Sequence, residues 1–295
     1  MSTLKETFLN ALEWTLTPSP LTFLLGALTV LLVPIFIHTL VVRSSPYTSP
    51  PTVLLAGPPN AGKTSLVTRL EGGKTAKKTH TSQKIHAAEL TAPSAASSRA
   101  SLAKALKDTD SKHTKFLLVD LPGHGKLRAD ALARFETKAL ADAKTKAVVF
   151  MLDASSLSDS AYLQDAATYL YDVLLALQRR TANIKTSKIP SAIPVLVAPN
   201  KSDLFTALPA ALVKSTLEGE IGRVRVSRSK GLLDSGVGGD EVGEEVDGWL
   251  GAYGTEKFGF EQMREFNVYV DVLGGSVLEE GAGVDKWWKW MTEKI

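Results

Sequence analysis

Residues 57–64 have the sequence GPPNAGKT, which places two glycines, a lysine and a threonine at the spacing G-x-x-x-x-G-K-T. This run follows an apolar strand-like segment, 52–56, and precedes 65–70, which has the pattern of an amphipathic helix. Backbone N–H groups of such a loop and the positive end of the following helix dipole converge on one point, which favours an anion. The glycines allow a close approach that a Cβ would block, the lysine can reach the β- and γ-phosphates, and the threonine hydroxyl can ligate magnesium. A nucleotide phosphate site is therefore predicted at Gly57, Pro58, Pro59, Asn60, Ala61, Gly62, Lys63, Thr64 and Ser65.

A second motif follows the next apolar run, 115–120, which ends in Asp120 and continues as Leu-Pro-Gly-His. Ligands of a parallel α/β sheet lie at the carboxyl ends of its strands, so Asp120 is predicted to hold magnesium through a water. Gly123 can offer its backbone N–H to the γ-phosphate, a contact that makes a loop sensitive to the nucleotide. His124 stands where many GTPases have a glutamine that orients the attacking water. No internal arginine finger is identifiable from the sequence, so slow intrinsic hydrolysis is expected.

Between these motifs, residues 72–84 are polar, basic and without periodicity, which indicates a loop. A first switch in this position needs a threonine that meets magnesium and the γ-phosphate. Thr81 is preferred, because 82–90 can then form the next strand, and Thr79 is the alternative.

A base pocket is predicted at the end of the apolar run 193–198, which leads into Asn200, Lys201, Ser202 and Asp203. The Asp203 carboxylate can accept hydrogen bonds from N1–H and the exocyclic amine of guanine, whereas adenine offers no such pair of donors. Asn200 can bond the base and tie neighbouring loops together, and the stem of Lys201 can cover the ring. After the last strand-like run, 266–273, Ser276 is the candidate for a backbone N–H to the guanine O6, with Val277 beside it.

Composition excludes several other classes of function. The 295 residues include 34 Lys and Arg against 31 Asp and Glu, a formal net charge of +3 that is too even to favour nucleic-acid binding. The chain has no cysteine, which excludes disulfides, thiolate metal sites and a cysteine nucleophile.

Strand-like and helical runs alternate along the chain, which predicts an α/β fold with a mostly parallel, doubly wound sheet of the P-loop GTPase kind. Residues 21–42 form a run of 22 residues without Asp, Glu, Lys or Arg, long enough for a transmembrane helix. A cleaved signal peptide and a buried helix are the alternatives for this run. The expected organisation is a luminal or interfacial segment at 1–20, the membrane helix at 21–42, a linker at 43–51 and a cytosolic nucleotide-binding domain at 52–295. Within that domain, a flexible acidic, glycine-rich loop is expected at about 233–255, and Trp287, Trp288 and Trp290 are expected to pack a last helix on the sheet.

The combination of these motifs resembles the beta subunits of the signal recognition particle receptor, a family of small GTPases close to the Arf and Sar1 group. The most specific features are GPPNAGKT at 57–64, DLPGHGKLR at 120–128 and NKSDLFTA at 200–207. The resemblance implies GTP or GDP with Mg²⁺ as ligands and a single-pass anchor in the endoplasmic reticulum membrane. It implies that the GTP form binds the N-terminal domain of the receptor's alpha subunit through the surface of Thr81 and 120–128, for cotranslational targeting of ribosomes to the translocon.

The leading hypothesis is therefore a docking module controlled by GTP, with no direct contact to nucleic acid. An Arf- or Sar1-like trafficking GTPase is the alternative within the same fold, although a fixed membrane span argues against it. An enzyme whose turnover matters, such as a phosphotransferase or a fast NTPase, is a third possibility, but the sequence offers no second substrate pocket and no identifiable base beyond His124.

Overall fold

The computed structural model divides the chain into two units, Met1–Ser49 and Pro50–Ile295, each described here by itself. The residues that the structure describes are 5–7, 9, 13, 19–44, 50–72, 79–92, 114–182, 191–234, 249–252, 255, 257–278 and 282–295.

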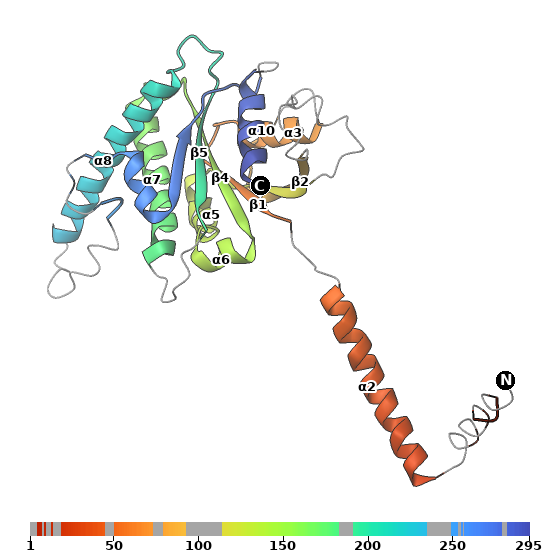
Figure 1. The fold of residues 1–295 in the computed structure, drawn as a ribbon. Helices are drawn as coiled ribbons and strands as arrows, with labels where there is room; N and C mark the ends of the chain where they lie inside the picture. Colours follow the sequence, from red (N-terminus) through yellow and green to blue (C-terminus); the bar gives the residue numbers. More distant parts are fainter. Residues whose placement is uncertain are drawn as a thin grey trace. The chain divides into compact units, whose positions relative to one another are not determined.

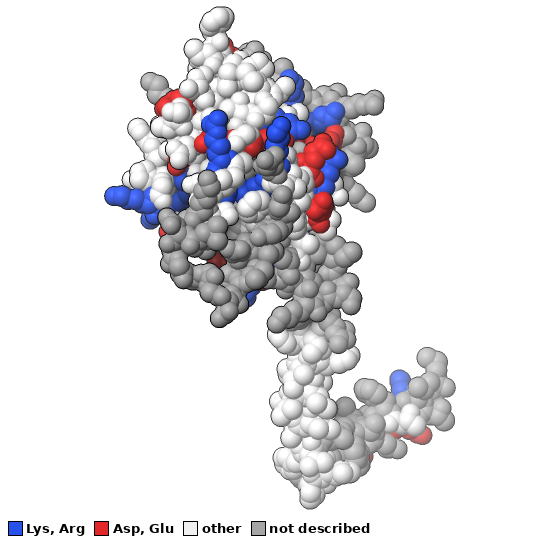
Figure 2. Space-filling view, turned by 90° about the vertical axis from the view of Figure 1, so that its left-hand side faces the viewer, with Lys and Arg blue, Asp and Glu red and all other residues white. Residues whose placement is uncertain are grey.

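In the first unit the main element is α2, a helix of 25 residues at Pro20–Ser44 that contains Pro34. Many of its large apolar side chains are exposed, and the side seen in Figure 2 carries no charged residue among those described. The sequence predicts a membrane helix at 21–42, a range that α2 covers. Among the helices in the described part of the chain, however, none is both long and apolar enough to qualify as a membrane span.

The second unit is built on a sheet of six strands in the order β2-β3-β1-β4-β5-β6. The strands are β1 (Thr52–Ala56), β2 (His86–Ala92), β3 (Thr114–Asp120), β4 (Thr145–Asp153), β5 (Ile193–Asn200) and β6 (Val268–Val272). All neighbouring pairs are parallel except β2 and β3, which are antiparallel. The predicted α/β fold with a mostly parallel sheet is confirmed, with β2 as an antiparallel edge strand.

The central strands are mostly apolar because both faces of the sheet are covered: β1 is buried throughout, and β4 is buried except at Lys146. In β1, Val53 and Leu55 pack into one hydrophobic cluster, and Leu54 and Ala56 pack into the other. This alternation follows from the two-residue period of a strand, which sends successive side chains to opposite faces. A single apolar run thus contributes to two cores.

One face of the sheet is covered by α3 (Lys63–Gly72) and α10 (Ala282–Lys294), which lie close to each other in Figure 1. Trp287, Trp288 and Trp290 of α10 are buried in this cluster, and Trp288 lies 5.8 Å from Phe116 of β3 between ring centroids. The prediction that these tryptophans pack the last helix on the sheet is confirmed.

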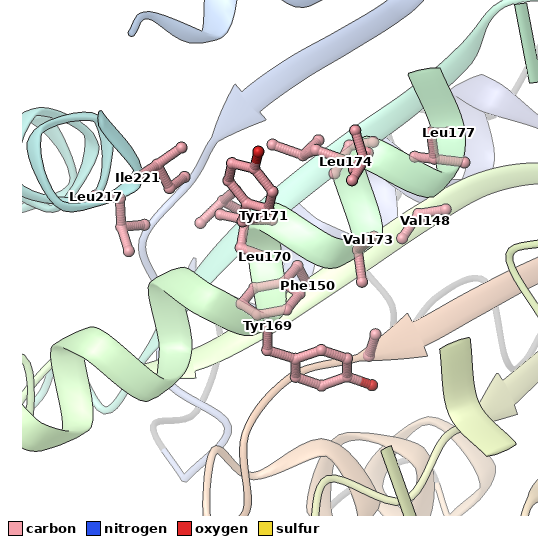
Figure 3. Close-up of a cluster of buried hydrophobic side chains, with 14 of the residues drawn as sticks. Val148, Phe150, Tyr169, Leu170, Tyr171, Val173, Leu174, Leu177, Leu217 and Ile221 are labelled. Atoms are coloured by element: carbon pink, nitrogen blue, oxygen red, sulfur yellow. The ribbon is translucent and has the colours of Figure 1, made fainter. Parts of the chain in front are cut away.

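The other face is covered by α7 (Ser160–Ala182), against which α8 (Ala210–Asp234) packs. Figure 3 shows Phe150 of β4, the α7 side chains Tyr169, Leu170 and Tyr171, and Leu217 and Ile221 of α8 as parts of one buried cluster. The shorter elements are η2 (Gly125–Leu127), α5 (Arg128–Ala133), α6 (Thr137–Asp142) and η3 (Phe260–Phe266). In the view of Figure 2, acidic and basic side chains are interspersed over the surface of this unit.

The segment predicted as an acidic flexible loop, 233–255, is only partly described. Helix α8 continues through Asp234, while 235–248 lie outside the described residues. At the far end, Gln178 of α7 hydrogen-bonds Trp249 O and Gly251 N–H, each at 2.8 Å, and the Arg225 guanidinium lies 4.4 Å over the Trp249 ring. Residues 249–252 are therefore attached to α7 and α8.

Candidate functional site: a phosphate loop and a base loop at one edge of the sheet

The loop 57–62 leaves β1 at the carboxyl edge of the sheet and runs directly into α3. Gly57 has φ +138°, and a Cβ there would lie 1.9 Å from Met151 O of β4. Gly62 has φ +96°, and a Cβ there would lie 2.2 Å from the Asn200 side-chain nitrogen. Both positions therefore require glycine, which is the physical reason for the spacing seen in the sequence.

Lys63 is the first residue of α3, and its side chain folds back over the loop. Its Nζ donates hydrogen bonds to Gly57 O at 2.8 Å and to Pro58 O at 2.9 Å. Burial lowers the pKa of Lys63 from its ordinary 10.5 to about 8, although the Asp120 carboxylate acts in the opposite direction. A buried cation with a depressed pKa is stabilised by any anion that joins it.

Thr64 and Asp120 bring the phosphate loop and the end of β3 together. The Thr64 hydroxyl donates a hydrogen bond of 2.6 Å to Asp120 Oδ2. Asp120 is fully buried, and its other oxygen, Oδ1, accepts no hydrogen bond from the described residues. Burial raises the pKa of Asp120, opposed by the Thr64 hydrogen bond and by the charge of Lys63. An orphaned carboxylate oxygen beside a hydroxyl is a donor set that suits Mg²⁺.

Gly123 lies against the phosphate loop. A Cβ at Gly123 would lie 2.5 Å from Lys63 Nζ and 2.6 Å from Gly57 O. Only a residue without a side chain allows its backbone to come this close to the lysine that would meet the phosphates. The arrangement is compatible with the predicted contact from the Gly123 N–H to a γ-phosphate.

Both candidate threonines of the first switch, Thr79 and Thr81, line one cavity together with residues of the phosphate loop. The Thr79 hydroxyl lies 3.0 Å from that of Ser65, within hydrogen-bonding distance. The strand that follows, β2, begins at His86 rather than at residue 82, which leaves 79–85 outside the sheet. The choice between Thr79 and Thr81 stays open.

Asn200, at the end of β5, ties the phosphate loop to residues 273–278 after β6, which are called the base loop. Its Nδ2 donates to Ala61 O at 2.8 Å, and its Oδ1 accepts from Val277 N–H at 3.0 Å. Asn200 is 3 % exposed, so both hydrogen bonds are shielded from water. The expectation that Asn200 ties neighbouring loops together is met by these two contacts.

Lys201 has a left-handed backbone, φ +63°, and its Nζ forms an ion pair of 2.5 Å with Asp153 Oδ2 at the end of β4. Burial alone would raise the pKa of Asp153, but hydrogen bonds from Lys201 and Ser155 outweigh it, so that pKa lies below its ordinary value. Asp203 is exposed and does not line the cavity. Asp203, the carboxylate predicted to bind guanine, is thus close in sequence to Asn200 and Lys201 of the cavity lining but does not itself line the cavity.

Ser276 and Val277 are buried at the end of the loop that follows β6, and both line the cavity. This loop is held against β5, since Gly275 N–H donates to Pro199 O at 2.9 Å and Ser202 N–H donates to Gly275 O at 3.2 Å. The loop predicted to meet the base therefore lies beside the Asn-Lys-Ser-Asp segment.

Together these loops line an open cavity of about 510 Å³. Its lining residues are Pro59, Asn60, Gly62, Lys63, Thr64, Ser65, Thr79, His80, Thr81, Ser82, Gly123, Asn200, Lys201, Ser276, Val277 and Leu278. This size lies within the range of small-molecule pockets. Phosphate loop, switch residues and base loop thus surround one space at the carboxyl edge of the sheet.

His124 is exposed and does not line the cavity. Its Nδ1 accepts a hydrogen bond of 3.3 Å from Lys126 N–H and caps the short helix η2. In the structure this side chain has a local capping contact, and its role in orienting water stays a prediction.

Two buried charged residues beside the site were missed by the sequence reasoning. Asp153 pairs with Lys201, and Arg69 of α3 donates a hydrogen bond to Val277 O. Asp153 had a signal, since it ends an apolar strand as Asp120 does. The sequence signal for Arg69 was weaker. Arg69 is a charged residue three positions after Leu66, on the buried side of α3.

Comparison with known proteins gives the family. A family model described as signal recognition particle receptor beta subunit matches residues 48–266. The chain belongs to the signal recognition particle receptor beta subunit family. The family membership inferred from the motifs is thereby confirmed. Signal recognition particle receptor subunit beta of Saccharomyces cerevisiae is 29 % identical over 247 residues, which cover 83 % of this chain and 84 % of the yeast protein.

Solved structures of this family have the same fold. The chain is similar to Chaetomium thermophilum SRβ in an SRβ–GTP/SRX complex of the signal recognition particle receptor, with 40 % identity, a TM-score of 0.70 and coverage of 83 % of this chain and 100 % of that chain. It is also similar to the SRβ–GDP–Mg form from the same organism, with 41 % identity, a TM-score of 0.61 and coverage of 84 % and 100 %. The mammalian SRP receptor gives 28 % identity, a TM-score of 0.56 and coverage of 83 % and 100 %.

Proposed function

We propose that this chain binds GTP and GDP with Mg²⁺ at the edge site and that its GTP form docks SRX, the N-terminal domain of the receptor's alpha subunit. The observation that carries the proposal is the convergence of the phosphate loop, Gly123 and the two base-side loops on one cavity, with Asp120 hydrogen-bonded to Thr64 of its lining. The Chaetomium thermophilum relatives, solved as SRβ–GTP/SRX and SRβ–GDP–Mg, support the choice of ligands and partner.

The phosphate end of the cavity fits a nucleotide with its metal. The 57–62 backbone and Lys63 would hold the phosphates, and the Thr64 hydroxyl would ligate Mg²⁺, with Asp120 holding the ion through a water. Mg²⁺ would neutralise part of the phosphate charge. Lys63 would exchange its hydrogen bonds to Gly57 O and Pro58 O for phosphate oxygens, which are stronger acceptors because they are charged.

The base end would select guanine. Asn200 holds the base loop at the level of the phosphate loop, and the aliphatic stem of Lys201 would cover the ring. For Asp203 to accept from guanine N1–H and the amine, its exposed side chain must turn toward the cavity when the base enters. The loop of Ser276 and Val277 would supply backbone N–H groups to O6.

The two segments that respond to the nucleotide would contact its γ-phosphate. Gly123 and a threonine of the 79–81 segment line the same cavity, so one added phosphate can hold both segments in a single arrangement. The partner would recognise the surface of Thr81 and 120–128 in that arrangement. Turnover is expected to be slow without a partner, because no arginine from the chain's own sequence is identified as a finger, and His124 is the candidate for positioning water.

The run 21–42 is proposed as a single-pass anchor in the endoplasmic reticulum membrane, with the second unit in the cytosol. Support comes from the 22 residues without a charged side chain, from exposed apolar side chains along α2, and from the family. Alkaline carbonate extraction tests this proposal: the full chain should stay with the membrane pellet. A variant with Leu31→Arg and Ile35→Arg should be released, and release of the wild type would overturn the anchor.

The docking proposal is tested by retention of purified SRX on the full chain loaded with GTP or with GDP. GTP-loaded protein should retain SRX and GDP-loaded protein should not. Thr64→Ala should lose Mg²⁺-dependent nucleotide binding and SRX retention together. Asp203→Asn should shift preference from GDP toward xanthosine diphosphate, because the amide offers a donor where the carboxylate offered an acceptor. SRX retention that ignores the nucleotide would contradict the switch.

A further inference from the structure

Helix α3 reaches from the phosphate loop to the base loop. It begins at Lys63, directly after the phosphate loop, and carries Arg69 about 1.7 turns further on. Arg69 is 7 % exposed, among Leu66, Val67 and Leu70, which are buried in the cluster beneath α10. A guanidinium in an apolar layer is costly unless its N–H groups find acceptors. Arg69 Nη1 donates to the carbonyl oxygen of Val277, in the base loop.

The base loop is thereby fixed from two sides at Val277. Arg69 bonds its carbonyl oxygen from α3, and Asn200 accepts its N–H from β5 at 3.0 Å. From the third side, α10 packs directly on the loop: a Cβ at Gly283 would lie 2.4 Å from Ser276 N and 2.9 Å from Ser276 O. These two hydrogen bonds and the close packing of α10 therefore fix the position of the base loop.

We propose that Arg69 is a positioning residue for recognition of the 6-oxo group of the purine. The inference rests on the proposed guanine site. Arg69 acts through the Val277 carbonyl, which holds the N–H groups of the base loop at the distance that O6 requires. Guanine and hypoxanthine present O6 as an acceptor, whereas 2-aminopurine lacks this oxygen. Loss of Arg69 should therefore lower the affinity for nucleotides whose purine carries a 6-oxo group. The phosphate contacts of Lys63 should remain in place.

The experiment compares three competitors for bound fluorescent GDP on the full chain: GDP, inosine diphosphate and 2-aminopurine riboside diphosphate. In Arg69→Met, the preference for GDP over the 2-aminopurine nucleotide should fall about tenfold, as expected when one charge-assisted hydrogen bond to the loop is lost. The affinity for inosine diphosphate should fall by the same factor as the affinity for GDP, because hypoxanthine keeps O6 and lacks only the amine of guanine. Arg69→Lys keeps a charged donor and should recover most of the preference.

The matched control is Arg223→Met, the same change at an exposed arginine of α8 that pairs with Glu220. It should leave all three affinities unchanged. Gly283→Ala disturbs the base loop from the α10 side and should lower the same preference, so it decides the matter if Arg69→Met fails to fold. Equal loss for all three nucleotides in the folded variants, or an unchanged ratio, would overturn the role of Arg69. Failure of the wild type to prefer GDP would instead overturn the proposed guanine site.

Discussion

Replacing Asn200 with alanine would cut the link between the phosphate loop and the base loop. The change removes the donor to Ala61 O at 2.8 Å and the acceptor of Val277 N–H at 3.0 Å, at a residue that is 3 % exposed. Each buried polar group left unpaired costs about 1–3 kcal/mol, so the two together cost roughly 2–6 kcal/mol. Water entering the space left by the side chain moves the cost toward the lower end.

At the lower end, about 2 kcal/mol of lost preorganisation corresponds to a roughly 30-fold weaker affinity for GDP. Titration of the full chain with a fluorescent GDP analogue measures the affinity, and a urea unfolding curve measures the stability. Gln164→Ala, at an exposed position of α7, is the matched control and should change neither quantity. If Asn200→Ala binds GDP within twofold of the wild type, the account of Asn200 as the link between the two loops is wrong.

Three further predictions concern the phosphate loop and the core. Gly123→Ala would place a methyl group 2.5 Å from Lys63 Nζ and 2.6 Å from Gly57 O, so GTP affinity should fall more than GDP affinity, at a cost of about 1–3 kcal/mol; unchanged GTP binding in a titration would contradict this contact. The pKa of Lys63 is about 8 in the folded protein, below its ordinary 10.5. Between pH 8 and pH 10.5 the unfolded chain therefore binds more protons than the folded protein. The free energy of unfolding of the nucleotide-free protein should rise with pH across that window. Because phosphate favours the charged lysine, GDP affinity should fall from about pH 8 upward, and Lys63→Arg should make that fall shallower; equal slopes in both proteins would exclude Lys63 as a source of it. Phe150→Ala should lower the free energy of unfolding by about 3–5 kcal/mol, because the ring is buried against Tyr169 at 5.5 Å between centroids; a loss below about 1 kcal/mol in urea unfolding would contradict that packing.

Much of the candidate site could be predicted because its parts are contiguous in sequence and sit where strands end. The phosphate loop needs glycine at two positions for steric reasons that the structure makes explicit at Gly57 and Gly62. Asp120 and Asn200 end buried strands, and parallel strands bring their carboxyl ends to one edge. The order of motifs along the chain therefore predicted their convergence in space.

Features that depend on side chains meeting across elements could not be predicted in this way. Arg69 is a helix residue whose partner, Val277, lies 208 positions later in the chain, and no local pattern records that contact. The pairing of Lys201 with Asp153 likewise depends on the register of β4 and β5, which sets Asp153 opposite Asn200. The position of Asp203 outside the cavity wall is a matter of side-chain direction, which residue type alone does not determine.

The central claim is that one edge of the sheet holds a guanine nucleotide with Mg²⁺. The most direct measurement is competition of GDP, GTP and ADP against a fluorescent GDP analogue on the wild-type full chain, with Mg²⁺ and with excess chelator. GDP and GTP should displace the probe and ADP should not, and chelation should accelerate release of the probe. Displacement by ADP as effective as by GDP, or absence of any saturable binding, would contradict the account.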